Sequence, residues 1–245
     1  QEEFWTIDVN LITPSEKTFL ARLTHLNGQR LDKFALPSRE MSQSVVEKIE
    51  KSDFSVHSIE KKRVRRNPQP PFTTSTLQQE ASRKLGMGAS RTMQTAQRLY
   101  EGVDIGGETV GLITYMRTDG VQMSQEAVTA ARQFIKTDYG DAFVPEKPRI
   151  YKSKAKNAQE AHEAVRPTDI TRSPKTLKAY LDGDQERLYD LIWKRSVASQ
   201  MASAELDQTS VMVESSDKAI TLRSSGSIIA FEGFLKVYQE DQDDL

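Results

Sequence analysis

The sequence contains no cysteine in its 245 residues, which excludes a disulfide framework and any metal site built on thiolates. Its three histidines, His25, His57 and His162, are too scattered to predict a zinc site. No apolar run reaches the roughly 18 residues that a membrane-spanning helix needs, and the opening QEEFWTIDVN lacks the basic and apolar regions of a signal peptide. We therefore expect no zinc centre and no membrane partner, and the lack of cysteine is consistent with a cytoplasmic location.

Charged residues nearly balance over the whole chain but are unevenly distributed along it. The net charge is −1, with 28% charged and 37% hydrophobic residues, which is typical of a globular protein. The segments KKRVRR at 61–66 and KPRIYKSKAKN at 147–157 each contain five basic residues, whereas EDQDD at 240–244 is acidic. A basic run most often forms a solvated surface or a linker, so the charge pattern alone does not establish a nucleic-acid partner.

The beginning of the chain predicts β-structure. Residues 5–11 alternate apolar and polar side chains with a period of two, which predicts a half-buried strand. The segment 17–26 leads to Asn27-Gly28, a dipeptide suited to positive φ at both central positions of a type I′ turn, and residues 29–34 are expected to return as a strand.

Helical spacing begins after a proline-rich segment. RRNPQPPF at 65–72 contains three prolines, which places a domain boundary near Asn67. We expect Ser75 to cap one helix that ends at the glycines of GMG, and Ser90 to cap the next. This pair is similar to a helix-turn-helix, but helical hairpins of this kind are common in proteins that bind no DNA.

Further helices and then strands complete the chain. The apolar periodicity predicts helices over residues 124–136, 157–166 and 184–202. From Glu205 onward, short apolar runs separated by turn residues predict four strands, in the segments TSVMVES, AITLRSS, SIIAFEG and FLKVYQ.

The order β, then α, then β predicts an α+β, multidomain fold. Residues 1–66 and 204–245, two segments separated in sequence, are expected to form one β-sheet domain. Residues 67–203 are expected to form a mainly α-helical domain inserted between them.

The segment GLITYMRTDG at 111–120 presents a tyrosine among small, hydroxylated and charged residues. A phenol with a pKa near 10 is a weak nucleophile at neutral pH, so a catalytic tyrosine needs a cation or a base beside it. In an extended backbone Tyr115 and Arg117 project to the same side, where the guanidinium could hold a phosphate under attack by the tyrosine. The alternative is a strand in which the two residues merely share a face.

A second candidate is the segment NAQEAHEAVRP at 157–167. On the predicted helix, Gln159, His162 and Arg166 share one face and form a row of hydrogen-bond donors able to contact a phosphate or an oxyanion. The alternative is an ordinary amphipathic helix whose histidine and arginine are solvated.

Four longer motifs follow one another along the chain, PFTTSTLQQEASRKLG at 71–86, QTAQRLYEG at 94–102, ITYMRTD at 113–119 and QEAHEAVRPTD at 159–169. In this order they resemble the signature segments of bacterial type IA DNA topoisomerases, specifically topoisomerase I. The similarity also covers the flanks, from EEFW at 2–5 to FEGFLKV at 231–237. One departure is the connection between Tyr100 and Tyr115, which is longer than expected and rich in glycine, so we expect an exposed loop there.

The resemblance implies a role for each candidate residue. Tyr115 matches the catalytic nucleophile, which becomes joined to the 5′ phosphate of a broken DNA strand. Arg117 matches the arginine that positions the scissile phosphate, and His162 matches a histidine that contacts backbone phosphate. Arg166 and Gln159 belong to the same motif, with phosphate binding as the implied role and structural support as an alternative for Arg166.

The resemblance also implies a complete enzyme of which this chain is the central fragment. Such an isomerase relaxes negatively supercoiled DNA without ATP, through a phosphotyrosine intermediate and passage of a strand. The β portion would be the arch and hinge domain, and the helical insertion would carry the nucleophile. The toprim domain with the ligands for Mg²⁺ would precede this region, so the fragment alone is expected to be inactive and to bind no metal. The partners of the fragment would be single-stranded DNA and that toprim domain. The enzyme would act at the nucleoid.

Two other function classes fit the same sequence. A non-catalytic DNA-binding helical module on a β scaffold would explain the helix pair and the basic segments. A structural or protein-interaction domain would explain the nearly neutral charge and the acidic tail. DNA binding that weakens steeply with salt separates these two, because phosphate contacts by Lys and Arg release counterions.

Overall fold

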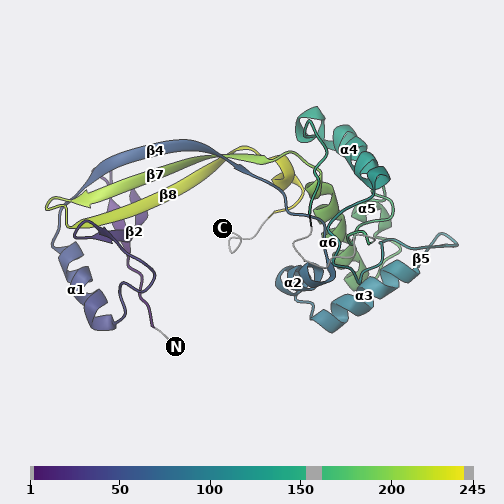
Figure 1. The fold of residues 1–245 in the computed structure, drawn as a ribbon, viewed down its shortest axis with the longest axis horizontal. Coiled ribbons are helices and arrows are strands. Elements are labelled where there is room, and N and C mark those ends of the chain that lie inside the picture. Colours follow the sequence, from purple (N-terminus) through teal and green to yellow (C-terminus); the bar gives the residue numbers. More distant parts are fainter. Residues whose placement is uncertain (1–2, 153–161, 240–245) are drawn as a thin grey trace. The chain divides into compact units, whose positions relative to one another are not determined.

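A computed structural model describes residues 3–152 and 162–239 (Figure 1). The chain divides into two compact units, one of Gln1–Val64 with Glu205–Ala230 and one of Arg65–Ala204 with Phe231–Leu245. The fold is mixed α and β, with an antiparallel sheet in the first unit and mostly helices in the second. Within the described ranges, no helix has the length and apolar character required to cross a bilayer.

The first unit is built on a single sheet in which strands from both ends of the chain pair. The strand order is β1-β2-β8-β7-β4, with β3 paired to β2, so that β4 forms an edge (Figure 1). Strand β2 pairs antiparallel with β1, β3 and β8. The strands are β1 (Asp8–Ile12), β2 (Thr18–Leu26), β3 (Gln29–Arg30), β4 (Phe54–Arg66), β7 (Ala204–Ser215) and β8 (Ile220–Phe231).

Apolar side chains that alternate with polar ones along these strands form the core of the first unit. Val9 faces Ala21 across the β1–β2 ladder, and the apolar positions of both strands contribute to one buried cluster. Helix α1 (Arg39–Glu50) begins at Ser38, whose hydroxyl accepts a hydrogen bond from the Met41 amide, and it adds Val45 and Ile49 to that cluster. The cluster consists of Ile7, Ala21, Leu23, Leu36, Val45, Ile49, Val213, Ile220 and Leu222.

The predicted Asn27-Gly28 turn is confirmed. Both residues have positive φ, 52° at Asn27 and 76° at Gly28, as the tight turn between β2 and β3 requires. The return strand is much shorter than the predicted 29–34, because only Gln29 and Arg30 pair with β2.

The second unit is organised around its longest helix. Helix α6 (Gly183–Ser199) packs against α2, α3, α4 and α5, and its buried side chains include Leu188, Tyr189 and Ile192 (Figure 1). The remaining elements are α2 (Thr74–Leu85), α3 (Ala89–Glu101), the β5–β6 hairpin (Val103–Ile105 and Glu108–Val110), α4 (Gln125–Tyr139), α5 (Pro174–Leu177) and two 3₁₀ turns (Asp141–Phe143 and Gly233–Lys236).

Two predicted helix caps are wrong by a few residues. Helix α2 begins at Thr73 rather than Ser75, because Thr73 and Thr76 exchange side-chain and backbone hydrogen bonds in a capping box. Helix α3 begins at Gly88 rather than Ser90, so Ser90 lies within the first turn of the helix. Between them Gly86 ends α2 in the left-handed conformation, as the sequence predicted.

The end of the chain also differs from the prediction. Two long strands, β7 and β8, replace the first three predicted strands, and FLKVYQ forms a 3₁₀ turn instead of a fourth strand. The amide of Phe234 donates to the carbonyl of Ala202, and the Tyr238 hydroxyl donates to Glu80. The described residues 231–239 therefore belong to the helical unit, whereas the predicted boundary at 204 assigned them to the β portion.

Arg195 on α6 fastens this helix to the segment that leads into α2. Its side chain is 8% exposed, its Nε donates to the carbonyl of Pro70 at 2.7 Å, and its guanidinium stacks over the rings of Phe72 and Tyr238 at 4.8 and 5.1 Å. A planar guanidinium is required to stack and donate at once, so this arginine acts as part of the core.

We expect Arg195→Lys to lower the free energy of unfolding of the helical unit by about 1–3 kcal/mol, because an ammonium group cannot keep both interactions. Urea unfolding followed by the fluorescence of Trp193, in a Trp5→Phe background, measures this unit specifically. The neighbouring Lys194, whose side chain is 44% exposed, provides the control, since Lys194→Arg keeps the charge beside Asp190 and should change the value by less than about 0.5 kcal/mol. Equal effects of the two substitutions would contradict this role for Arg195.

Candidate active site

The segment that contains Tyr115 lies between three other parts of the helical unit. The amide of Leu112 donates to Leu99 at the end of α3, at 2.8 Å. The amide of Thr114 donates to the carbonyl of Arg166 at 2.9 Å. The carbonyl of Thr118 accepts from the amide of Thr74 at the start of α2, also at 2.9 Å. These contacts hold residues 112–118 in place although the segment belongs to no helix or strand.

Side chains along this segment alternate between the interior and the surface. Met116 is fully buried and Thr118 is 9% exposed, whereas Tyr115 is 46% exposed and Arg117 is exposed. Arg117 makes no hydrogen bond or ion pair with any residue that the structure describes. The phenol and the guanidinium are therefore both available at the surface.

Thr114 and Thr74 supply side-chain hydrogen bonds that reinforce this backbone path. The Thr114 hydroxyl donates to the carbonyl of Ala164 at 2.7 Å and accepts the amide of Arg166 at 3.0 Å. The Thr74 hydroxyl donates to the carbonyl of Met116 at 2.7 Å and accepts the amide of Thr118 at 2.8 Å. The Thr114 hydroxyl thus satisfies backbone groups of Ala164 and Arg166, and the Thr74 hydroxyl those of Met116 and Thr118, which no helix or strand satisfies.

His162 lies beside the end of the same segment. A Cβ atom added at Gly120 would collide with the backbone carbonyl of His162, so glycine permits a close approach of the two chains. Two residues further on, the amide of Ala164 donates to the carbonyl of Gln122 at 2.8 Å. The side chain of His162 is exposed.

The predicted helix over 157–166 is wrong for its last five residues. Residues 162–166 are extended, with Val165 bridged to Phe72 and Pro167 to Ile113. Tertiary pairing overrides the local helical periodicity, so His162 and Arg166 do not share a helical face. Gln159 lies outside the described residues.

Arg166 is engaged within the protein. Its Nε and Nη2 donate to the two carboxylate oxygens of Glu163 at 2.5 and 3.0 Å, and its Nη1 donates to the carbonyl of Pro167. Glu163 also accepts the amide of Ser124, the residue that caps α4. This ion pair therefore joins the 162–167 segment to the beginning of α4.

The electrostatics of Glu163 follow from these contacts. Burial alone raises the pKa of its carboxyl group, but the hydrogen bonds from Arg166 and the Ser124 amide, with the charge of Arg166, hold the pKa below the ordinary value of 4.5. The carboxylate is thus more acidic in the folded protein than in the unfolded chain.

The rings of Tyr100 and Tyr115 meet edge to face. Their centroids are 5.4 Å apart at an interplanar angle of 66°. Tyr100 lies in the last turn of α3 and is itself 40% exposed, so this contact connects α3 to Tyr115.

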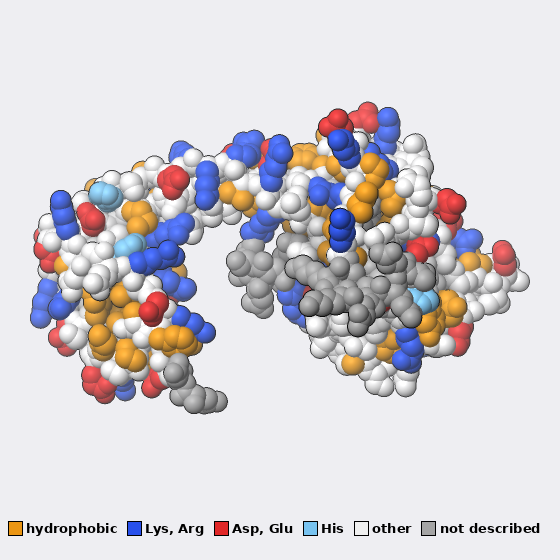
Figure 2. All heavy atoms as spheres, viewed as in Figure 1, with side chains coloured by type: hydrophobic (Ala, Val, Ile, Leu, Met, Phe, Trp, Pro, Cys, Tyr) orange, Lys and Arg blue, Asp and Glu red, His pale blue; other side chains and the backbone are white. Residues whose placement is uncertain are grey.

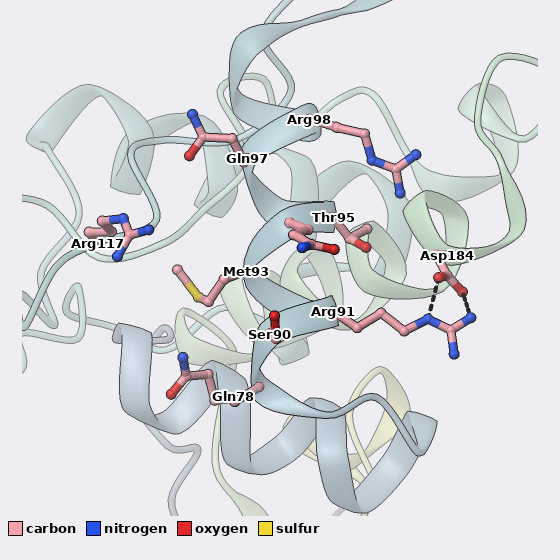
Figure 3. Close-up of a pocket in the computed structure, with 11 residues that line it drawn as sticks. Gln78, Ser90, Arg91, Met93, Thr95, Gln97, Arg98, Arg117 and Asp184 are labelled. Atoms are coloured by element: carbon pink, nitrogen blue, oxygen red, sulfur yellow. Dashed lines mark hydrogen bonds and ion pairs between the residues drawn. The ribbon is translucent and has the colours of Figure 1, made fainter.

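A surface groove lies over α3 and extends to Arg117. Its volume is about 890 Å³. In Figure 3, Met93 and Gln97 project from α3 to the side on which Arg117 lies, whereas Arg91 and Arg98 project to the other side, with Arg91 bonded to Asp184.

Several cations in the two basic segments are also engaged within the protein. Arg63 on β4 donates to Asp207 at 2.8 and 3.1 Å, and Arg149 donates to the carbonyl of Met201 and the hydroxyl of Ser203. Figure 2 shows other Lys and Arg side chains along the strands of the first unit. The number of basic residues therefore overstates the positive charge available to a ligand.

Sequence reasoning missed the residues that support the site. Thr74, Thr114 and Tyr100 were not singled out, since their partners are distant in sequence. The Glu163–Arg166 pair had a detectable signal in the i, i+3 spacing of opposite charges, although the helix that this spacing normally accompanies is absent from 162–166.

The described residues do not offer a metal site. In the part of the chain that the structure covers, no three or more His, Asp or Glu side chains are grouped closely enough to hold an ion. A divalent cation would therefore need ligands from elsewhere.

Comparisons with known proteins agree on one family. The family model described as DNA topoisomerase matches residues 1–245. The chain is 53% identical over 243 residues to DNA topoisomerase 1 of Rickettsia bellii (strain RML369-C), and 48% identical over 243 residues to that of Zymomonas mobilis. These matches cover 99% of this chain but only 30% and 19% of the two relatives, so the chain spans less than a third of either.

A solved structure shares the fold. Full-length topoisomerase I from Thermotoga maritima matches with a TM-score of 0.78 and 30% sequence identity. The match covers 99% of this chain and 37% of the Thermotoga chain.

We expect Thr114→Val to destabilise the helical unit by about 1–3 kcal/mol, because the carbonyl of Ala164 and the amide of Arg166 lose their partner. Urea unfolding followed by Trp193 fluorescence measures the change. Thr114→Ser retains the hydroxyl and should recover most of the loss; a serine variant as unstable as the valine variant would argue against the hydrogen bonds.

Acid should weaken the Glu163–Arg166 contact. Because the folded-state pKa of Glu163 is lowered, its contribution to stability is present above the unfolded value near 4.5 and is lost as the pH falls through the folded pKa. The stability difference between the parent protein and Glu163→Gln should therefore shrink as the pH falls below 4.5. Urea titrations at pH 7, 5, 4 and 3 measure it; a difference that is constant with pH would show that ionisation of Glu163 does not matter.

Proposed function

The chain belongs to the bacterial DNA topoisomerases of type IA, and from that premise we propose that Tyr115 is the nucleophile of a reversible DNA strand-cleavage reaction. The observation that carries the proposal is the surface position of Tyr115, two residues from an arginine with no partner among the described residues. The resulting activity of the complete protein is the relaxation of negatively supercoiled DNA.

The reaction is a transesterification at a backbone phosphate. The phenolic oxygen of Tyr115 forms a bond to phosphorus while the bond to the 3′ oxygen breaks, and the tyrosine becomes joined to the 5′ phosphate. The phenol loses its proton, and the leaving 3′ oxygen gains one. Because one phosphodiester replaces another, the reverse attack by the 3′ hydroxyl restores the strand without ATP.

Arg117 stabilises the charge that builds on the phosphate during this attack. Its guanidinium can donate two hydrogen bonds to phosphate oxygens, and it is exposed and uncommitted where Arg166 is engaged with Glu163. Removing one such donor typically costs about 3 kcal/mol of transition-state stabilisation, or on the order of a hundredfold in rate.

His162 and the rest of its motif have different roles. The imidazole of His162 is exposed, and the backbone of this residue passes beside Gly120. We assign to His162 a contact with a DNA backbone phosphate that neighbours the scissile phosphate. Arg166 supports the site by holding residues 163–167 in place, and Gln159 remains a candidate for phosphate contact.

The rest of the enzyme supplies what these residues lack. Type IA topoisomerases generally depend on Mg²⁺, and the described residues do not fit that ion, so its ligands are assigned to the toprim domain of the complete protein. We assign the β unit to the arch and the helical unit to the domain that carries the nucleophile. Single-stranded and negatively supercoiled DNA are the substrates, and the nucleoid in the cytoplasm is the place of action.

A DNA-binding module without chemistry is the alternative, in which Tyr115 would contact the strand without attacking it. The exposure of Tyr115 excludes only a packing role of the kind that Tyr189 has in α6, where it has no exposed surface. The two accounts differ in whether a covalent bond to DNA forms.

We expect Tyr115→Phe to abolish the covalent protein–DNA adduct in the complete gene product while leaving the affinity for the strand within about twofold, because only the attacking oxygen is removed. The assay incubates the protein with a 3′-labelled single-stranded oligonucleotide and Mg²⁺, and detects the protein-linked product on a denaturing gel.

The matched control is Tyr180→Phe, since Tyr180 is 45% exposed in the same unit and Tyr115 is 46% exposed. This control should form the adduct as the parent protein does. An adduct that persists in Tyr115→Phe would overturn the assignment, and strand binding without any adduct in the parent protein would favour the binding module. The isolated 245-residue chain should form no adduct unless the toprim domain is added.

A further inference from the structure

One face of α3 is uncovered and leads directly to Tyr115. Ser90, Gln94, Gln97 and Tyr100 follow one another at spacings of three or four residues, which places them along a single side of the helix. The last of them, Tyr100, meets the ring of Tyr115. The face of α3 and the proposed nucleophile thus form one continuous surface.

The groove over α3 is lined mostly by polar side chains. Gln78 from α2 and Arg117 from the segment of Tyr115 border the same groove as Ser90 and Gln94. These four residues make no hydrogen bond or ion pair with any other described residue. Figure 3 shows Gln78 and Arg117 on the same side of α3 as Met93.

Cationic groups lie on both margins of the groove. Arg117 borders one side, and on the other Arg91 bonds to Asp184 and Arg98 to Asp182. The side chains of Arg91 and Arg98 remain 58% and 50% exposed in these pairs. The margins of the groove thus carry three guanidinium groups and two carboxylates, and this excess of positive charge favours an anionic occupant.

We propose that this groove holds the part of the DNA strand that becomes joined to Tyr115, on the 3′ side of the break. The inference rests on the proposed function of Tyr115. In it, Arg117 contacts the scissile phosphate, and Gln94 and Gln78 hydrogen-bond to the nucleotides that follow. The phenol of Tyr100 offers an exposed ring on which the first of these bases can stack.

The dimensions of α3 set the length of strand that fits. Ten residues separate Ser90 from Tyr100, and at a rise of 1.5 Å per residue this distance is about 15 Å. Stacked nucleotides advance by about 3.4 Å each, so the groove accommodates about four of them.

The chemistry of the lining favours a nucleic acid strand over a protein segment. A glutamine amide presents a donor and an acceptor together, the pattern that base edges also present, and arginine suits phosphate. Met93 is the main apolar contribution to the lining beside Ala89, whereas protein interfaces normally have an apolar centre.

The test measures how affinity depends on the length of DNA beyond the break. Cleavage is first mapped with the parent protein, and binding is then measured in a Tyr115→Phe background, which prevents covalent attachment. The probes are single-stranded oligonucleotides with identical sequence before the mapped position and one, four or eight nucleotides after it. Gln94→Glu and Gln78→Glu, made in the complete gene product, keep the size of the side chain but add a negative charge.

We expect the four-nucleotide probe to bind roughly tenfold more tightly than the one-nucleotide probe, with little further gain at eight, because the added nucleotides reach Tyr100, Gln94 and Gln78 and then leave the groove. Gln94→Glu and Gln78→Glu should each remove most of that gain while leaving the one-nucleotide probe unaffected. The control is Gln133→Glu on the exposed side of α4, which should retain the full gain.

The assignment of the strand to the α3 groove would be overturned if Gln94→Glu and Gln78→Glu left the increase in affinity with probe length intact. It would also be overturned if the Tyr115→Phe protein without these substitutions showed no such increase. Either result leaves the proposed function standing if the parent protein forms its Tyr115-dependent adduct. Absence of that adduct is the separate outcome that removes both proposals.

Discussion

The hydrogen bonds of Thr114 are the interaction on which the candidate site depends. A segment outside helix and sheet must satisfy its backbone groups through distant partners, or remain mobile. Thr114 achieves this with its amide, bonded to the carbonyl of Arg166, and its hydroxyl, bonded to Ala164 and the Arg166 amide. Because the next residue is Tyr115, the same contacts fix where the phenol emerges from the surface.

Local signals predicted the glycine turns correctly but placed the caps of α2 and α3 two residues too late. The turn at Asn27 and Gly28 and the end of α2 at Gly86 both follow from the conformational freedom of single residues. The four motifs also identified the family correctly, because each is a contiguous run of residues whose order carries the resemblance. The non-helical course of 162–167 was inaccessible because the bridge partners of Val165 and Pro167, Phe72 and Ile113, lie about 50 or more positions away.

Charge in the sequence proved a poor guide to charge available to a ligand. Arg63, Arg149 and Arg166 all point their guanidinium groups at acceptors within the protein, whereas Arg117 does not. The difference arises from three-dimensional pairing: Arg63 and Asp207 meet only because β4 and β7 share a sheet. The number of arginines in a sequence is therefore an upper limit on the guanidinium groups that can bind a ligand. Pairing within the folded protein determines which of these groups remain free.

The β5–β6 hairpin follows α3 and precedes the segment of Tyr115, yet it lies outside the path that holds the tyrosine. Its base is closed by the bond from Leu112 to Leu99, and Gly111 allows the chain to pass close to the carbonyl of Tyr100. Its tip, at Gly106 and Gly107, is exposed. The hairpin is thus a side branch whose length can drift during evolution without displacing the nucleophile, and its tip offers a place to graft a fluorescent reporter.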